Sequence, residues 1–354
     1  MLENIQPIPK GIFGKEGFDQ WCLDASRTHL NHGAYGALTK SLFDYVNQLR
    51  FEIEKSPAYF IRTKLPQYLR HNAHLLGHYI GAKGEDLVFV DNASAGANAV
   101  LRALSLLPND EIVTTNRTYD SVRQILHFVA DRANAKIVEI PLDPWHQNPS
   151  EILKSFLQTI NAHTRLVVVD HITSSSAQIL PINELSYECQ QRGINILIDG
   201  AQAPGILPLD ITSIGCHWYI GNLHKWFGAP RGTAFLWVNP EYQALTRPCV
   251  ITRTLHQGFL QSFDWPGSKD FAAWLSIEAL LEERKRWQNQ QSVCEYASNL
   301  VHEASKILSK RWQSRYNHHA NIPMAIVELP SSLGRTKSDA FNLGIKLAQD
   351  YAID

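Results

Sequence analysis

Short apolar runs alternate with longer amphipathic stretches between residues 85 and 240 of this chain. The short runs are rich in β-branched residues, a pattern typical of buried strands. Strands are predicted at Leu87–Asp91, Glu111–Thr115, Lys136–Ile140, Arg165–Asp170, Ile194–Ile198, Cys216–Ile220 and Thr233–Val238.

The stretches between the first five strands have helical periodicity. Because strands that alternate with such helices form βαβ units, the pattern predicts an α/β fold with a mainly parallel sheet. The runs at 87–90 and 166–169 are apolar on both faces, as expected for strands covered by helices on both sides. Ligands of such sheets bind beyond the carboxyl ends of the strands. Helices are predicted at Ala95–Leu107, Tyr119–Ala133, Pro149–Asn161 and Pro181–Arg192.

The remaining parts of the chain are less regular. Residues 40–82 are predicted to be helical with a break near Pro57, and residues 270–315 to form a long amphipathic helix. A strand is expected within 321–329 and a helix at 336–351. The charged run at 282–286 is typical of a solvated helix face. His71, His74 and His78 share one helix face, but no carboxylate or cysteine completes a metal shell, so a surface face is expected and no metal site is predicted.

Composition narrows the function classes. A length of 354 residues suggests two domains. The net charge of −1 argues against a nucleic-acid partner, and no apolar run is long enough for a membrane span or a signal core. The five cysteines are widely scattered and none has CxxC spacing, which argues against a disulfide framework or zinc site and fits a reducing, cytoplasmic location.

Asp199 and Lys225 carry the most specific chemical signal. Asp199 ends one apolar run, and Lys225 follows the next, between His224 and Trp226. A lysine can form a Schiff base with pyridoxal phosphate (PLP), and an acid can keep the pyridine nitrogen protonated. Taken singly, a strand-end Asp is commonly a helix cap and a loop Lys a solvated charge. Their combination after consecutive strands predicts that both are catalytic.

The segment 92–96 follows the first strand and opens a helix. Its small residues Ala93, Ser94 and Ala95 would let backbone N–H groups approach a phosphate at the positive end of that helix. The alternative is a plain Ser/Asn helix cap.

Four further residues are predicted to contact the cofactor from strand ends. Tyr119 opens a helix, where its ring would stack on the pyridine, and Gln202 would bond the ring hydroxyl oxygen. Asn222 and His224 precede Lys225 closely enough to reach the phosphate.

Six segments together resemble the class V aminotransferase family of fold-type I PLP enzymes, nearest to the isopenicillin N epimerase-like branch with its selenocysteine lyase and cysteine desulfurase relatives. The resemblance implies a large domain with a mainly parallel seven-stranded sheet flanked by helices, and a smaller α+β C-terminal domain. It also adds Ser174 to the cofactor contacts. The matching segments are 30–36, 92–96, 170–174, 198–202, 221–232 and 265–270.

The resemblance further implies three regions. Residues 1–40 would join the small domain and the active site, 41–250 would form the PLP-binding domain, and 251–354 the small domain. Family members usually continue some tens of residues further and take a carboxylate-binding arginine from that tail, so the small domain is expected to be incomplete.

A homodimer with a shared active site is also implied. Ser268 would reach the phosphate of the partner's cofactor. Asn31, His32, Tyr35 and Arg62 are candidate substrate contacts.

The predicted function is that of a PLP enzyme acting at the α-carbon of an amino acid or amine through a Lys225 Schiff base, similar to isopenicillin N epimerase. Transamination is a second outcome of the same chemistry. A C–S or C–Se lyase is the alternative, without a persulfide step because residues 295–354 hold no cysteine. A non-catalytic PLP-binding protein is the third hypothesis.

Overall fold

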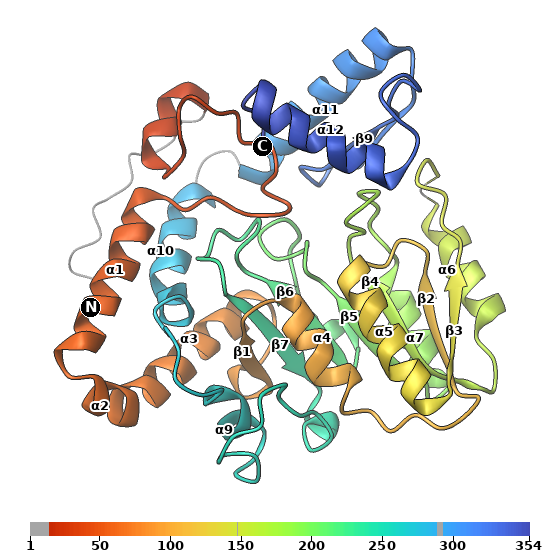
Figure 1. The fold of residues 1–354 in the computed structure, drawn as a ribbon. Helices are drawn as coiled ribbons and strands as arrows, with labels where there is room; N and C mark the ends of the chain where they lie inside the picture. The colour runs from red at the N-terminus through yellow and green to blue at the C-terminus, as the bar shows by residue number, and fades with distance from the viewer. Residues whose placement is uncertain (1–13, 147, 289–292) are drawn as a thin grey trace.

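A seven-stranded sheet forms the centre of the chain (Figure 1). The structure is a computed structural model and describes residues 14–146, 148–288 and 293–354. The strand order is β1-β7-β6-β5-β4-β2-β3; β7 runs antiparallel to β1 and β6, and the other neighbours are parallel. The strands are β1 (Leu87–Val90), β2 (Glu111–Thr115), β3 (Lys136–Ile140), β4 (Thr164–Asp170), β5 (Asn195–Asp199), β6 (Trp218–Asn222) and β7 (Ala234–Val238).

All seven predicted strands are therefore confirmed, as is the mainly parallel α/β sheet. β6 lies slightly later than the predicted Cys216–Ile220. The preceding Gly215 adopts the left-handed conformation that ends the short helix α8 (Ile211–Ile214), and the next residues still connect this turn to the sheet.

Helices cover both faces of the sheet, and each face has its own buried apolar cluster. One face packs against α4 (Ala93–Leu101), α5 (Asp120–Ala133) and α9 (Phe259–Asp264). The other face packs against α1 (Lys40–Lys55), α3 (Leu65–Tyr79), α6 (Pro149–Thr159), α7 (Ile182–Gln191) and α10 (Ile277–Gln288). This double cover explains why the central strands are apolar on both faces.

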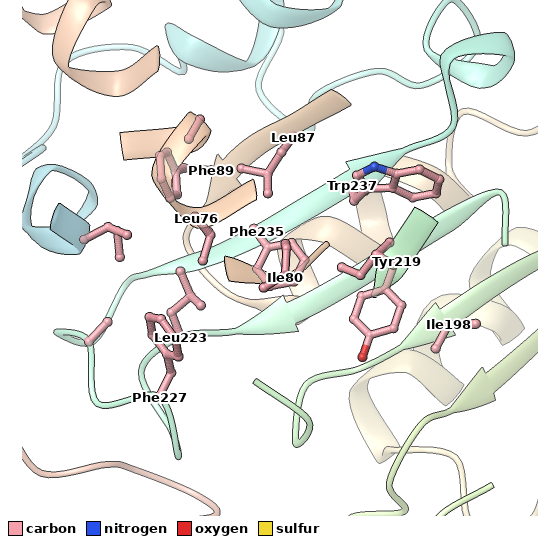
Figure 2. Packing of buried hydrophobic residues seen from close by; sticks show 14 of the residues in the cluster. Leu76, Ile80, Leu87, Phe89, Ile198, Tyr219, Leu223, Phe227, Phe235 and Trp237 are labelled. Atoms are coloured by element: carbon pink, nitrogen blue, oxygen red, sulfur yellow. The ribbon is translucent and has the colours of Figure 1, made fainter. Parts of the chain in front are cut away.

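Large side chains fill the layer between the sheet and α3. Figure 2 shows Phe89, Tyr219, Phe235 and Trp237 of neighbouring strands on the same side as Leu76. Each of these side chains is at most 4% exposed. Because burying one such side chain contributes about 1.5–3 kcal/mol, this layer holds the carboxyl ends of the strands in fixed positions.

Two of the predicted helices have different ends in the structure. α4 ends at Leu101, not at the predicted Leu107. Pro108 disfavours helical backbone only at Leu107 and does not account for the earlier end. After Leu101 the N–H of Ala103 donates to the carbonyl of Val100 in a tight turn, and the helical bonding stops there. The predicted helix at 270–315 consists of a short turn at Trp274–Ser276, then α10, then α11 (Val293–Trp312), and residues 289–292 lie outside the described part.

The stretch at 40–82 is helical, as expected, and changes character near Pro57. After α1 come α2 (Pro57–Tyr59), a π-helical turn at Phe60–Lys64 and α3. His71, His74 and His78 are exposed on α3, as predicted. His71 lies 3.2 Å from the carboxylate of Glu278.

The charged run at 282–286 is not the solvated face that the sequence predicts. Glu283 is 2% exposed and accepts a hydrogen bond from the hydroxyl of Ser41. Arg284 donates to the carbonyls of Trp226 and Phe227 at 3.3 and 3.0 Å. Through these hydrogen bonds, the side chains of Glu283 and Arg284 connect α10 to α1 and to the loop that follows Lys225.

A small α+β unit follows α10. It contains α11, β8 (Tyr316–His318), β9 (Ala325–Val327) and α12 (Lys337–Asp350), and β8 pairs antiparallel with β9. β9 and α12 lie where a strand and a helix are predicted; β8 was not predicted. Short 3₁₀ turns at Gly14–Gln20, Gly84–Asp86 and Pro240–Tyr242 complete the described elements.

The N-terminal segment joins this C-terminal unit. Thr28 and Leu30 donate backbone hydrogen bonds to Ala352 and Asp354 at 2.8 and 2.9 Å, and Arg27 pairs with the Asp354 carboxylate. Figure 1 shows the C-terminus beside the N-terminal segment, drawn in red. These contacts agree with the prediction that residues 1–40 join the small domain. The predicted division into 41–250 and 251–354 stays a prediction, although α9 and α10, which follow residue 250, pack on the large sheet. None of the helices in the described ranges is both long and apolar enough to cross a membrane.

Candidate active site

Polar residues gather where β4, β5 and β6 end. Asp170 and Asp199 are the last residues of β4 and β5 and are direct partners in the parallel pairing. Lys225 lies on the loop that follows β6, whose Ile220 pairs with Asp199. The sheet therefore brings two acids and one amine to one edge, which is the position that α/β sheets use for ligands.

Asp199 and Lys225 are both buried, at 4% and 9% exposure. Burial raises the pKa of Asp199, while the backbone N–H of Ala201, which donates to Oδ1 at 3.0 Å, and the charge of Lys225 oppose the rise. Burial lowers the pKa of Lys225, against the attraction of Asp199 and Asp170. Desolvation favours the neutral, nucleophilic form of the amine, and the two acids oppose this effect.

Tyr119 lies on the same side as Lys225. It precedes α5, its ring is 44% exposed, and the Nζ of Lys225 lies 5.8 Å from the centre of that ring. A half-exposed aromatic ring next to the amine supplies the flat surface on which a heteroaromatic ring would stack.

Gln202 connects three segments. Its Nε2 donates to the carbonyl of Gly33 at 2.9 Å, and its Oε1 accepts from the indole N–H of Trp226 at 2.7 Å. Ser174 lies within 3.4 Å of the same Nε2. These bonds orient the amide of Gln202, and its predicted contact with the cofactor hydroxyl oxygen stays a prediction.

His32 packs against this network. Its ring stacks on Trp226 with centroids 6.1 Å apart, and its Nε2 accepts the N–H of Ala37 at 3.3 Å. Burial and the neighbouring His29 lower the pKa of His32 to about 4, so the ring is neutral at pH 7. The candidate substrate residues Asn31 and Tyr35 are exposed; the carbonyl of Asn31 accepts N–H bonds from Ala34 and Tyr35.

Two of the three backbone N–H groups predicted to bind a phosphate at the start of α4 already donate to side chains of the protein. The N–H of Ala95 donates to the Asn92 side chain at 2.9 Å, and the N–H of Ala93 donates to the Asn222 side chain at 2.8 Å. Within the described ranges, the N–H of Ser94 has no acceptor. Ser94 is therefore the predicted contact whose backbone donor and hydroxyl are both available to a phosphate.

His224 is oriented by Thr233, which directly precedes β7. Its Nδ1 lies 3.2 Å from the carbonyl of Thr233, and burial lowers the pKa of the ring. Its predicted phosphate contact stays a prediction.

Ser268 and Arg62 line the same cavity. This cavity has a volume of about 500 Å³, and its walls do not include Lys225 or Asp199 of the same chain. Arg231, another basic residue of the loops, donates to the carbonyl of Gly36 at 3.4 Å. The cavity is lined by Pro57, Ala58, Ile61, Arg62, Thr252, Arg253, Trp265 and Ser268.

Four residues in or near the site were given no role from the sequence. Asp170 is a second buried acid, and His171 shares a 2.8 Å hydrogen bond with the hydroxyl of Tyr219. Gly200 makes room for that tyrosine, because a Cβ atom on Gly200 would lie 2.2 Å from its ring. Cys249 was not connected to the site, yet its Sγ lies 3.3 Å from the carbonyl of Ala95. The position of Asp170 at the end of a predicted strand was the available signal.

These residues fit PLP and no metal. The buried amine, the buried acid, the flat ring and the free N–H of Ser94 match the aldehyde, the ring nitrogen, the pyridine face and the phosphate, respectively. The Oδ2 of Asp170 is a further buried polar atom without a hydrogen-bond partner among the described residues. Within those residues, no cluster of three or more His, Cys, Asp or Glu side chains suits a metal ion.

Comparison with known families decides the classification. The model of the aminotransferase class-V family matches residues 65–326, most of the chain. The chain belongs to this family. Its members depend on PLP, so the cofactor and the family expected from the sequence are both confirmed, at the level of the family.

Relatives with different named activities match the chain. The isopenicillin N epimerases of Amycolatopsis lactamdurans and Streptomyces clavuligerus are 28% and 32% identical over 75% and 64% of this chain, which spans 71% and 57% of their lengths. The L-cysteine desulfhydrase of Arabidopsis thaliana is 24% identical over 92% of this chain and 76% of its own.

Solved structures show the same fold. A C-DES mutant with glycine covalently linked to its PLP cofactor has a TM-score of 0.76 at 18% identity, over 93% of this chain and 88% of that chain. The cysteine desulfurase CsdA of Escherichia coli has a TM-score of 0.75 at 18% identity, over 97% of this chain and 88% of that chain. The fold-type I architecture expected from the sequence is confirmed.

Proposed function

We propose that this chain is a PLP-dependent enzyme that acts at the α-carbon of an amino acid or a related amine, with Lys225 as the cofactor-carrying residue. The observation that carries the proposal is the buried pair of Lys225 and Asp199 at adjoining strand ends. Bound PLP supplies an electron-withdrawing ring that stabilises negative charge at the α-carbon of an attached amine.

Each residue of the site has a task in this proposal. Asp199 holds a proton on the ring nitrogen, because a buried carboxylate favours a positive charge beside it. Lys225 would carry the cofactor and serve as the base at the α-carbon, a task that its lowered pKa suits. The ring of Tyr119 would stack on the cofactor, and Ser94 and Asn222 would hold its phosphate.

The specific reaction is proposed to resemble that of isopenicillin N epimerase, namely return of a proton to the opposite face of the α-carbon. The two epimerases among the relatives support this reading. A C–S lyase is the second candidate, supported by an L-cysteine desulfhydrase relative that matches 92% of this chain.

A persulfide step on a cysteine is disfavoured in either case. Cys294 lies in α11, its Sγ is 3.4 Å from the carbonyl of Asn321, and burial raises the pKa of its thiol. Burial also raises the pKa of Cys249. Both thiols are therefore poor nucleophiles at neutral pH. Free cysteines throughout the chain also support the expected reducing compartment.

We also propose a homodimer. The proposal is supported by a cavity that Ser268 and Arg62 line and whose walls include neither Lys225 nor Asp199 of the same chain, as expected for residues donated to a partner's active site. Arg62 would then be available to a substrate carboxylate in the partner's site.

One experiment tests the reaction class. The PLP-loaded protein is incubated in D₂O with a panel of L-amino acids that includes cysteine and cystine, and exchange of the α-hydrogen is followed by NMR. Exchange in the wild type but not in Lys225→Ala supports the proposal. D-amino acid identifies epimerisation, pyruvate with sulfide identifies the lyase, and a keto acid identifies transamination. No exchange with any substrate, with PLP bound, favours the non-catalytic alternative.

A further inference from the structure

Asp170 and Asp199 form a pair of carboxyl groups at the end of the sheet. They are direct partners on the parallel strands β4 and β5, whose backbones lie about 4.8 Å apart in such sheets. Val168 and Leu197, which precede the two acids by two residues, both pack in the cluster beneath α4 and α5. Residues two apart in a strand share a face, so the side chains of Asp170 and Asp199 point to the same side of the sheet. They are 3% and 4% exposed.

The two carboxyl groups have unequal surroundings. Asp199 accepts the N–H of Ala201 at 3.0 Å, whereas the Oδ2 of Asp170 has no hydrogen-bond partner in the described part of the chain. A buried carboxylate oxygen without a donor is costly when it is charged and much less so when it is protonated. Of the two acids, Asp170 is therefore the better site for a proton.

Few groups can supply positive charge to this pair. Lys225 is the cation that acts on both acids, and the backbone N–H of Tyr119 acts on Asp170. Tyr219 faces Asp199, but its own pKa is raised well above its usual value by burial, so it stays protonated. Its partner His171 has a pKa of about 4 because it is buried, and is neutral at pH 7. One cation thus faces two acids.

We propose that Asp170 is held protonated at neutral pH beside an ionised Asp199, so that the pair presents a single negative charge to Lys225 and to the pyridine nitrogen. The part of this proposal that concerns the pyridine nitrogen rests on the proposed function. Asp170 acts through Asp199 and is a positioning residue.

The electrostatics of the site agree with this assignment. Burial, and next the charge of Asp199, raise the pKa of Asp170 well above its ordinary value, against the opposing effects of its own backbone N–H, of Lys225 and of the Tyr119 N–H. Two like charges that share a buried site cannot both ionise easily. A single charge satisfies the ring nitrogen, while a second one would hold Lys225 as an ammonium ion and make it a poorer base.

Infrared spectroscopy tests the protonation state directly. The carbonyl stretch of a protonated carboxylic acid is recorded for the PLP-loaded protein at pH 8, where Asp264, whose pKa is raised to about 6 by burial, is ionised. We expect a band in the wild type that is absent from Asp170→Asn and retained in Asp350→Asn, an exposed control on α12. A wild type without such a band, or a band that persists in Asp170→Asn, overturns the proposal.

The pH dependence of unfolding supplies a second readout. When the pKa of a carboxyl group is higher in the folded than in the unfolded state, the protein loses stability as pH rises from about 4 toward the folded pKa. Asp170→Asn lacks this loss, so its stability relative to the wild type is expected to grow with pH; Asp170→Ser serves if the Asn variant does not fold. A wild type that instead gains stability over this range, relative to the variant, shows that Asp170 is ionised.

PLP affinity separates this proposal from the proposed function. Because an amide mimics the neutral acid, the affinity of Asp170→Asn for PLP is expected to lie within about tenfold of the wild-type affinity, a difference in free energy that corresponds to about one pKa unit. A larger loss of affinity in a folded variant contradicts the proposal. If the wild type does not bind PLP at all, the proposed function fails, while the infrared band still decides the charge of the pair.

Discussion

Gly36 lies directly against the backbone of Lys225. A Cβ atom on Gly36 would come within 2.2 Å of the carbonyl oxygen of Lys225, and the N–H of Gly36 donates to the carbonyl of His224 at 2.9 Å. The N-terminal segment and the lysine loop are thus packed together with no space between their backbones. The glycine-containing segment 30–36 that signals the family is a structural part of the active site.

Gly36→Ala is expected to displace the lysine loop. The added methyl group meets backbone atoms that cannot rotate away, so the variant should lose about 1–3 kcal/mol of unfolding free energy and at least tenfold in PLP affinity. Urea unfolding and PLP titration measure the two effects. Gly344→Ala in α12 is the matched control, because its Cβ would meet nothing within 4 Å. Equal PLP affinity in both variants would argue against this packing.

Asp199→Asn is expected to retain PLP and lose about 100-fold or more in turnover. An amide cannot hold a proton on the pyridine nitrogen, and general acid–base arrangements of this kind contribute about 10²–10⁴-fold. Turnover is compared at equal PLP occupancy, measured by absorbance. Wild-type rates in Asp199→Asn would place the ring acid elsewhere.

Ser268→Ala is expected to weaken PLP binding if the partner's site includes this hydroxyl. A hydrogen bond to a phosphate is worth about 1.5–3 kcal/mol, or roughly 10- to 150-fold in affinity. Ser268→Thr keeps the hydroxyl and should restore binding. Equilibrium dialysis with analytical ultracentrifugation follows PLP and mass together, and a monomer that holds full PLP at micromolar concentration contradicts the shared site.

The PLP-free protein should become more stable as pH rises toward 10. Because burial lowers the pKa of Lys225 in the folded state, the unfolded chain binds the proton more tightly between that pKa and the ordinary lysine value of about 10.4. Stability is therefore lost as pH falls through this window. Lys225→Met should flatten this dependence, and Lys310→Met, an exposed lysine of α11, should not. A wild-type profile that matches Lys225→Met in urea unfolding would show that Lys225 is not desolvated.

Most of the seven strands could be predicted from the sequence because the central ones are buried on both faces and have apolar runs. The edge strand β3 is partly exposed and was predicted from its β-branched residues and its place between two helices. The positions of Asp199 at the end of β5 and of Lys225 just past β6 could be predicted with them, and the roles of these two residues stay predictions. The partnership of Asp170 with Asp199 depends on β4 and β5 being neighbours, which the local sequence does not specify. The position of a polar residue at a strand end was readable; its partner across the sheet was not.

Long-range contacts account for the other differences. The charged run at 282–286 has the composition of a solvated face, and no local pattern distinguishes Arg284, which binds the loop beyond Lys225. Ser268 and Arg62 line the same cavity although they are far apart in the chain. Helix ends were predicted least well where no glycine or proline marks the last turn, as at Leu101.

Covalent attachment of PLP to Lys225 is the claim on which the account depends. The PLP-loaded protein is reduced with borohydride, digested, and mapped by mass spectrometry. The account predicts that the fixed cofactor is on Lys225 in the wild type, with a visible absorbance that disappears on reduction, and that Lys225→Ala yields no such adduct. An adduct on another lysine in the wild type, or the same amount of fixed cofactor in Lys225→Ala, would contradict it.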